Sequence, residues 1–323
     1  MKIVLFHQGA LGDFLVAAGA LEGVFTSEPG VVVDFWSKRE HFSLLTGKGY
    51  LGEFHSLDGP LIPALLDDSA WETTPLPGFL ARAQQVFVVG QAGSRLLAER
   101  LSARLSAKVL LLRSFPPPDH AGSHAFDYIS AQLSTLGLPC GKGFLSLEPP
   151  ESDMFAAQEF LKARAVEAKP VLVHPGSGGR RKIWPLAKWR DLLYWLSREL
   201  SLPVLLSVGP ADECLREFAE MMSGEGITVL HGFSRARLAA FIAQCRLYLG
   251  SDSGVGHLAA AVGTPSVVVF GPTDPEVWAP RGESVRVVRG DWSERDVFEW
   301  DPSAAPGVPD AEVAGEIRSL LEV

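Results

Sequence analysis

Residues that suit phosphate binding gather in one segment of this chain, residues 248–282. Asp252, Ser253, Gly254 and His257 directly follow an apolar run there. A strand, a Gly-containing turn and a helix in this order aim backbone N–H groups at a ligand, and a phosphate suits that helix N-terminus best. We expect Ser253 and Gly254 to be donors, and the Asp252 carboxylate to accept hydrogen bonds from amides of its own turn. The same turn also fits an ordinary capped helix.

A basic segment follows an earlier apolar run, Val171–His174. A Gly-rich turn comes next and leads to Arg180, Arg181 and Lys182. Lys182 suits a diphosphate as a point charge, and Ser177 suits it as a hydroxyl donor. A solvated basic turn is the alternative interpretation. Two phosphate-type turns after strands in one half of the chain favour the binding site.

A third turn, in residues 7–21, contains Gly9, Gly12 and Asp13. Asp13 opens a helix, so it is either a helix N-cap or a general base. A dinucleotide-binding turn needs G-x-G-x-x-G, and a third glycine in register is missing. Asp34 follows a second apolar run, in the place of a ribose-binding acid, which keeps a dehydrogenase as an alternative. The mismatched glycines disfavour that alternative.

Strand-like apolar runs alternate with amphipathic segments along the whole chain. The pattern predicts an α/β fold with parallel sheets covered on both faces. It pauses at residues 137–153, which gather Gly, Pro and Ser and are the predicted linker. We therefore expect two doubly wound, Rossmann-like domains, 1–150 and 151–323, facing each other across a cleft. The predicted strands are Ile3–Phe6, Val31–Phe35, Val86–Val89, Val109–Leu112, Val171–His174, Val204–Val208, Thr228–Leu230, Leu247–Leu249 and Ser266–Phe270.

Composition limits the classes of function. The 323 residues are 47% hydrophobic, enough for two cores, and carry a formal net charge of −9, which disfavours a nucleic-acid partner. Three widely spaced cysteines predict neither a disulfide framework nor a zinc site and indicate a cytoplasmic protein. A run of 18 apolar residues is missing, so we expect no membrane span, although peripheral membrane contact stays open.

Together the three segments resemble glycosyltransferase family 9, the ADP-heptose:lipopolysaccharide heptosyltransferases, over essentially the whole chain. The resemblance implies a GT-B architecture and inverting transfer of heptose from ADP-heptose onto the lipopolysaccharide inner core. The implied partners are a nucleotide-sugar donor and a glycan acceptor at the cytoplasmic face of the inner membrane. The matching motifs are G-A-L-G-D at Gly9–Asp13, H-P-G-S-G at His174–Gly178, K-x-W-P at Lys182–Pro185, S-D-S-G-x-x-H-L-A-A-A-x-G-T-P at Ser251–Pro265 and F-G-P-T-D-P at Phe270–Pro275.

The resemblance also assigns roles to single residues. Asp13 matches the family's catalytic base, and Lys182 matches its lysine on the nucleotide phosphates. Glu213 falls where the family places an acid on the nucleoside, in the ribose region. The segment from Asp252 to His257 matches the diphosphate loop. The domain 1–150 is then the acceptor side, and 151–323 binds the nucleotide sugar.

Two other functions remain open from the residues. A GT-B sugar-nucleotide epimerase would need acid and base groups around the sugar from both halves, and the turn at Gly9–Asp13 supplies one carboxylate. A non-catalytic nucleotide-sugar-binding protein would not need Asp13 and Lys182. The sequence contains no D-x-D pair for a metal-held diphosphate. We therefore expect no metal and no cofactor, with the sugar nucleotide as substrate.

Overall fold

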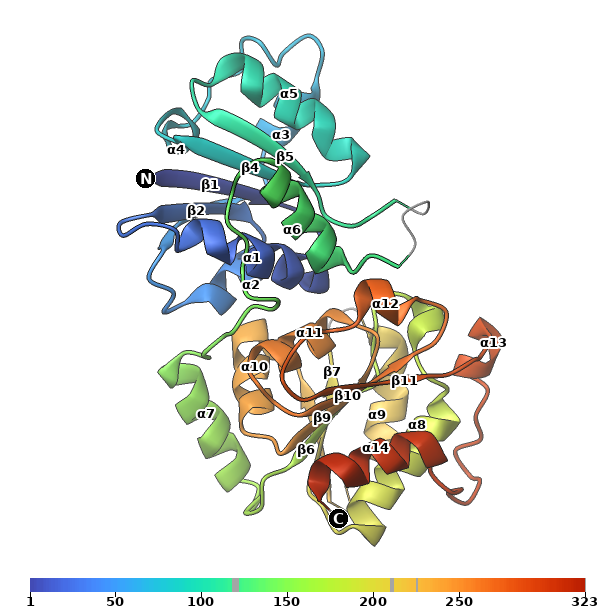
Figure 1. Ribbon diagram of the computed structural model, residues 1–323. Helices are drawn as coiled ribbons and strands as arrows, with labels where there is room; N and C mark the ends of the chain where they lie inside the picture. Colours follow the sequence, from blue (N-terminus) through green and yellow to red (C-terminus); the bar gives the residue numbers. More distant parts are fainter. Residues whose placement is uncertain (118–121, 210–211, 225, 323) are drawn as a thin grey trace. The chain divides into compact units, whose positions relative to one another are not determined.

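The computed structural model describes residues 1–117, 122–209, 212–224 and 226–322 (Figure 1). The chain divides into two compact units, Met1–Leu145 and Ser146–Val323. This division falls within the Gly- and Pro-rich stretch 137–153. Each unit has its own parallel sheet, so the predicted α/β class is confirmed.

The first unit is built on five parallel strands in the order β3-β2-β1-β4-β5. Their bounds are β1 (Lys2–His7), β2 (Val32–Ser37), β3 (Leu51–Ser56), β4 (Gln85–Gly90) and β5 (Lys108–Arg113). The topological switch point of such a sheet lies at the carboxyl ends of β1 and β4, where the strand order reverses. Central strand β1 is almost fully buried, which explains its continuous apolar run.

Helices cover both faces of this sheet (Figure 1). On one face α1 (Leu11–Phe25) packs against α6 (Ala125–Thr135). The other face carries a core cluster formed with α3 (Leu61–Leu66), α4 (Gly78–Ala81) and α5 (Arg95–Arg104). The remaining short helices are α2 (Arg39–Phe42), η1 (Ser43–Leu45) and η2 (Ala92–Ser94).

The second unit has six parallel strands in the order β8-β7-β6-β9-β10-β11. Their bounds are β6 (Val171–His174), β7 (Val204–Val208), β8 (Ile227–His231), β9 (Leu247–Ser251), β10 (Ser266–Phe270) and β11 (Val285–Arg289). Numbered within the unit, this is the order 3-2-1-4-5-6 of the Rossmann fold. The switch point lies at the carboxyl ends of β6 and β9.

The helices of the second unit again lie on two faces of the sheet (Figure 1). A large core cluster joins one face to α8 (Leu186–Tyr194), α9 (Arg216–Met222) and α14 (Ala311–Leu321). On the other side α10 (Arg235–Ala243) contacts α7 (Glu151–Lys162) and α11 (Gly254–Ala261). The remaining helical segments are η3 (Arg180–Lys182), the π-helical η4 (Trp195–Glu199), η5 (Glu213–Leu215), α12 (Pro275–Trp278) and α13 (Glu294–Val297).

The nine predicted strands are present, and the two strands that the pattern missed lie at sheet edges. The missed strands, β3 and β11, are largely half-buried or exposed and carry polar residues, so they lack a continuous apolar run. The sequence pattern predicts no helix over Glu151–Lys162, where α7 lies. It predicts a turn at Ser251–Gly256 with a helix from His257, whereas α11 begins at Gly254. Gly-rich first turns have weak helix propensity, which hides such a start in the sequence.

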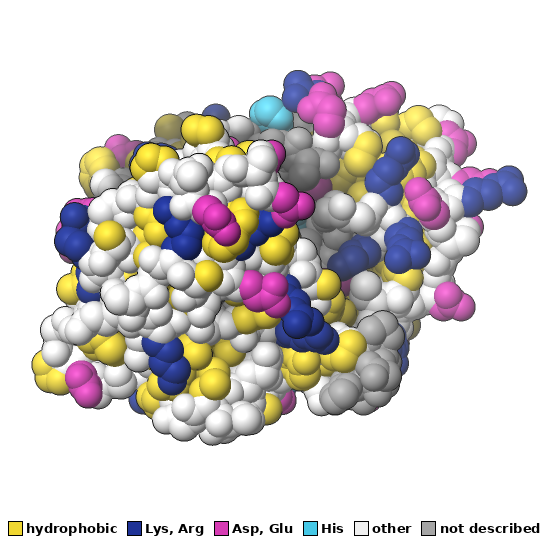
Figure 2. All heavy atoms as spheres, turned by 90° about the horizontal axis from the view of Figure 1, so that it is seen from above, with side chains coloured by type: hydrophobic (Ala, Val, Ile, Leu, Met, Phe, Trp, Pro, Cys, Tyr) yellow, Lys and Arg dark blue, Asp and Glu magenta, His cyan; other side chains and the backbone are white. Residues whose placement is uncertain are grey.

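Figure 2 shows acidic, basic and hydrophobic side chains interspersed over the face in view. Within the described parts of the chain, none of the helices combines the length and the apolar character needed to cross a bilayer.

Candidate active site

The predicted phosphate turns of the second unit meet at the switch point of its sheet. Strands β6 and β9 are neighbours, with His174 opposite Gly250 at their carboxyl ends. The turns that leave them are hydrogen-bonded to each other. The Ser177 hydroxyl donates to the Asp252 carbonyl at 2.6 Å, and the Ser251 hydroxyl donates to the Pro175 carbonyl at 2.8 Å. The two turns therefore form one loop cluster.

Lys182 is held at this cluster by Asp252. Its ammonium Nζ lies 2.9 Å from Asp252 Oδ2, and the lysine side chain is 32% exposed. The same carboxylate oxygen accepts a hydrogen bond from the Thr273 hydroxyl at 2.5 Å. We expected Asp252 to accept from amides of its own turn, and that expectation is wrong, because its carboxylate binds the side chains of Lys182, on η3, and Thr273, after β10. The partly exposed ammonium stays accessible to an anion.

Helix α11 begins directly after Asp252. Ser253 is its N-cap by position, yet within the described chain its side chain makes no capping hydrogen bond. Gly254 is the first helical residue and His257 is the fourth. His257 is half-buried and interacts with neighbouring groups. The N–H groups of a first helical turn have no partner inside the helix and attract an anion. Lys182 and the start of α11 thus supply positive charge at one edge.

A buried polar pair supports the loop after β6. His174 donates from Nδ1 to the Ser207 carbonyl at 3.1 Å, and its Nε2 lies 3.8 Å from Asp212 Oδ2. Burial lowers the pKa of His174, against the opposite effects of the Asp212 carboxylate and the Ser207 carbonyl. Asp212 also accepts from the Gly209 N–H at 2.8 Å. A Cβ on Gly176 would lie 2.2 Å from the Asp212 carboxyl group, so only glycine fits there.

Glu213 stands apart from Ser177, Lys182 and Asp252. It begins η5 after β7, one strand away from β6, and its side chain is 70% exposed. Its carboxylate pairs with Arg216 at 2.8 Å. Residues 210–211 of the motif that suggested it lie outside the described residues. Sequence reasoning chose Glu213 and missed Asp212, because the burial of Asp212 against Gly176 depends on packing between segments distant in the sequence.

In the first unit, Asp13 lies beside the switch point. It is the third residue of α1, and its Oδ2 accepts a hydrogen bond from the Ala10 N–H at 3.3 Å. Because Ala10 is the N-cap, the alternative that Asp13 is the N-cap is wrong by position. From the third helical position, the carboxylate still caps the N-terminus of α1 through this hydrogen bond. Asp13 is half-buried, within reach of solvent.

His7 is a neighbour of Asp13 that sequence reasoning missed. It ends β1, is almost fully buried, and faces Asp13 across Gly9. A Cβ at Gly9 would lie 2.8 Å from His7 Cε1 and 3.1 Å from Asp13 Oδ2. Burial, with a smaller effect of Lys38, lowers the pKa of His7 to about 4. His7 is therefore neutral at pH 7 and leaves the charge of this turn to Asp13.

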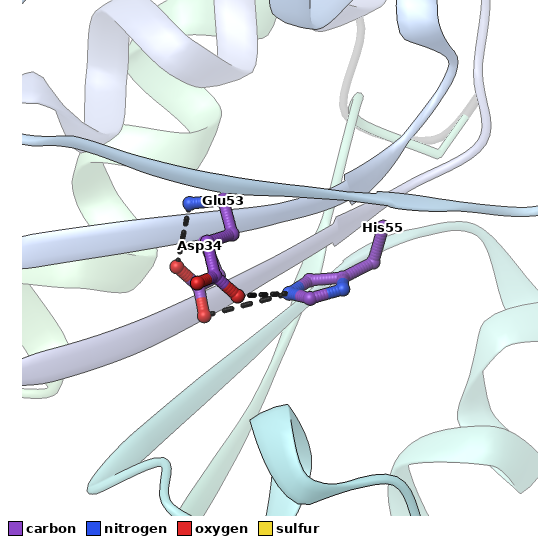
Figure 3. A group of neighbouring side chains, drawn as sticks. All are labelled: Asp34, Glu53 and His55. Atoms are coloured by element: carbon purple, nitrogen blue, oxygen red, sulfur yellow. Dashed lines mark hydrogen bonds and ion pairs between the residues drawn. The ribbon is translucent and has the colours of Figure 1, made fainter.

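Asp34 belongs to a separate cluster with Glu53 and His55 (Figure 3). Their ligand-type atoms lie within 4.8 Å of one another, a set that suits a divalent cation. However, Lys2 Nζ lies 2.7 Å from Asp34 Oδ1, the Glu53 N–H donates to the same oxygen at 2.8 Å, and His55 stacks on Phe79. These internal contacts account for the side chains without a metal. Asp34 also lies in mid-strand opposite Val4, so its suggested ribose-binding position is wrong.

A structural role for Asp34 predicts a loss of stability. Asp34→Ala should lower the free energy of unfolding by about 2 kcal/mol, because the fully buried carboxylate neutralises Lys2 and satisfies the Glu53 N–H. Glu53→Gln is the matched control, since that side chain is 67% exposed and should change little. Urea denaturation measures both. Equal stability of the two variants would contradict this role.

Fold and site together define a class. Two Rossmann-like units, the second with a lysine and a helix N-terminus at its switch point, are the parts of a GT-B glycosyltransferase. The family model described as glycosyltransferase family 9 (heptosyltransferase) matches residues 111–301. This chain belongs to that family and is a glycosyltransferase.

Two relatives are similar in sequence to this chain over most of its length. Lipopolysaccharide heptosyltransferase 1 of Pseudomonas aeruginosa is 38% identical over 314 residues, covering 88% of this chain and 82% of the relative. The Escherichia coli K12 protein of that name is 30% identical over 318 residues, covering 90% and 93%.

Solved structures share the fold. A family 9 glycosyltransferase from Veillonella parvula superposes with a TM-score of 0.75 at 19% identity, covering 100% of this chain and 98% of that one. The E. coli ADP-heptose lipopolysaccharide heptosyltransferase II gives 0.73 at 18% identity, covering 100% and 99%.

Proposed function

We propose that this protein transfers heptose from ADP-heptose onto the lipopolysaccharide inner core, with inversion at the anomeric carbon. The observation that carries the proposal is the loop cluster at β6 and β9, where Lys182 and the N-terminus of α11 converge on one edge. The names of the relatives support heptose as the sugar, and a solved structure of E. coli heptosyltransferase WaaC is described with ADP. The names of these relatives do not favour the alternative function of a sugar-nucleotide epimerase.

In the proposed mechanism the second unit holds the nucleotide. The diphosphate lies against Lys182 and the first turn of α11, with Ser177, Ser253, Gly254 and His257 around it. As the bond between the sugar and ADP breaks, the leaving diphosphate keeps the electron pair and gains charge, which the ammonium and the helix N-terminus stabilise. They supply positive charge from the chain's own groups, so we propose a reaction without a metal or cofactor.

Glu213 is proposed as the acid that binds the ribose. Its high exposure leaves the carboxylate accessible, and its position after β7 lies next to β6 at the carboxyl end of the sheet. A ribose hydroxyl would compete there with Arg216, which holds the carboxylate in an exposed ion pair of low strength.

Asp13 is proposed as the base of the first unit, the acceptor side. It removes the proton from the acceptor hydroxyl as that oxygen forms a bond to the anomeric carbon. The N-terminal end of α1 favours the negative charge of the half-buried Asp13 carboxylate, and His7 beside it is almost fully buried, which leaves Asp13 as the base within reach of an acceptor hydroxyl. Because base and phosphate site lie in different units, the reaction needs both. Peripheral contact with the cytoplasmic face of the inner membrane belongs to this proposal, and flotation with lipid vesicles measures it.

Nucleotide selectivity tests the proposed donor. We expect ADP to raise the melting temperature of the protein in scanning fluorimetry more than UDP, GDP or CDP at equal concentration, because a ligand that binds the native state stabilises it by mass action. Selective stabilisation by one of the other diphosphates would contradict ADP-heptose as donor. Equal stabilisation by all four would show binding of the diphosphate alone.

A further inference from the structure

The short segment η3, which carries Lys182, has few contacts of its own to hold it in place. It is three residues long, none of its side chains is buried, and Gly178 and Gly179 precede it. A single helical turn is not stable alone, because fixing its backbone costs more free energy than one hydrogen bond returns. The position of the Lys182 ammonium therefore depends on the contacts that η3 makes with other segments.

Trp292, which follows β11, makes one of these contacts. Its indole N–H donates to the Arg181 carbonyl at 3.0 Å, directly before Lys182 in the chain. Phe298, which follows α13, makes another, because the Arg180 guanidinium carbon lies 4.6 Å from the centre of its ring. The hydrogen bond from Trp292 holds the main chain of η3, so it fixes the point from which the lysine side chain extends.

The same indole ring packs on the main chain where β10 and β11 end. A Cβ on Gly271, after β10, would collide with the ring, and one on Gly290, after β11, would lie 2.7 Å from Trp292 Cζ3. A larger residue at either position would displace the ring. Trp292 is half-buried, and its place is set by these two strand ends.

Both segments that Trp292 contacts lead to Asp252. Lys182 lies on η3, and Thr273 lies in the segment that begins with Gly271. The Lys182 ammonium and the Thr273 hydroxyl bind the same oxygen, Asp252 Oδ2, at 2.9 and 2.5 Å. One indole ring therefore joins the two segments whose side chains meet on this carboxylate, next to the start of α11.

We propose that Trp292 is a positioning residue for Lys182. By tying η3 to the segment after β10, it keeps the ammonium where a diphosphate at the N-terminus of α11 would lie. Lysine has a long, flexible side chain, and holding its base in place lowers the entropy that is lost when the ligand binds. The inference rests on the proposed function, because it needs a diphosphate at this helix. It requires no contact between Trp292 and the ligand.

Titration calorimetry on the full-length Trp292→Phe protein tests the inference. Phenylalanine keeps a ring over the two glycines and loses the N–H donor. We expect ADP to bind roughly three- to tenfold more weakly than to the wild type at low salt, the range of one lost hydrogen bond. Adenosine, which has no phosphate, should bind equally to both. The melting temperature should change little, because water can replace the donor at this exposed carbonyl.

A double-mutant cycle with Lys182→Ala separates positioning from general stabilisation. In the Lys182→Ala background, Trp292→Phe should have no further effect on ADP affinity, because the group that Trp292 positions is gone. In the wild-type background, the effect of Trp292→Phe should shrink in high salt, since it acts through a partly exposed charge.

Trp300→Phe is the matched control. Trp300 is also half-buried and lies in the same C-terminal segment, but its ring packs edge-on against Phe218 on α9, 5.2 Å away between ring centres. ADP affinity should stay at the wild-type value in this variant.

Three results would overturn the inference. They are wild-type ADP affinity in a folded Trp292→Phe protein, equal losses of ADP and adenosine affinity, and a loss that persists in full without Lys182. If the wild type itself binds none of the four nucleoside diphosphates, the proposed function fails, and this inference fails with it. The wild-type titration therefore separates the two failures.

Discussion

Asp13→Asn should lower the rate of heptosyl transfer by about 10²-fold or more, the scale of a lost general base. Asparagine keeps the size of the side chain and an oxygen that can accept from the Ala10 N–H, so the start of α1 is preserved. It cannot take a proton from the acceptor hydroxyl. ADP affinity should stay at the wild-type value, because Asp13 lies in the first unit. Single-turnover kinetics and calorimetry measure the two quantities.

Asp153→Asn provides the matched control for this variant. Asp153 is also the third residue of its helix, α7, and its carboxylate pairs with Arg237 at 2.7 Å. If Asp13 only stabilises a helix start, both variants should lose some stability and keep their turnover. Transfer at the wild-type rate in Asp13→Asn would overturn the assignment of the base.

Lys182→Ala should weaken ADP binding by roughly 10- to 100-fold at low salt, the range expected for one hydrogen bond between charged groups. The loss has two causes. The ammonium no longer attracts the diphosphate, and the buried Asp252 carboxylate is left without its cation and repels the ligand. Adenosine binding should change little. The difference between ADP and adenosine should shrink in high salt, because a partly exposed charge is screened.

Lys188→Ala controls for the loss of a positive charge nearby. Lys188 is half exposed and pairs with Asp310 on the N-terminal side of α14. We expect ADP affinity close to the wild-type value for this variant. Equal losses of ADP and adenosine affinity in Lys182→Ala would place the lysine away from the phosphates.

Much of the fold could be predicted because its central strands are buried on both faces. A strand such as β9 reads as an unbroken apolar run, and such runs between helices indicate a parallel sheet. The edge strands β3 and β11 could not be found this way, since solvent and polar neighbours leave no continuous run. The Gly-rich first turn of α11 hid three helical residues for a different reason, its weak intrinsic propensity.

The candidate site was predictable only at the level of its loops. The carboxyl ends of neighbouring parallel strands share one edge, so turns after Val171–His174 and Leu247–Leu249 could be expected to meet. Side-chain partners were not predictable, because they depend on packing between segments distant in sequence. Asp252 pairs with Lys182, 70 positions earlier in the numbering, and not with amides of its own turn. Buried His7 looks like a core residue in the sequence, and only its position beside Asp13 in the structure relates it to the site.

The most direct test of the proposed function is a transfer assay with ADP-heptose and a lipopolysaccharide inner-core acceptor, followed by NMR of the product. We predict a new glycosidic bond whose anomeric configuration is opposite to that of the donor, with one ADP released per bond. Inversion requires the acceptor oxygen to attack the anomeric carbon from the side opposite the leaving diphosphate. One carboxylate, that of Asp13, is sufficient as the base for such a single displacement. A product with retained configuration, or ADP release without any glycosidic product, would contradict the proposed inverting heptosyl transfer.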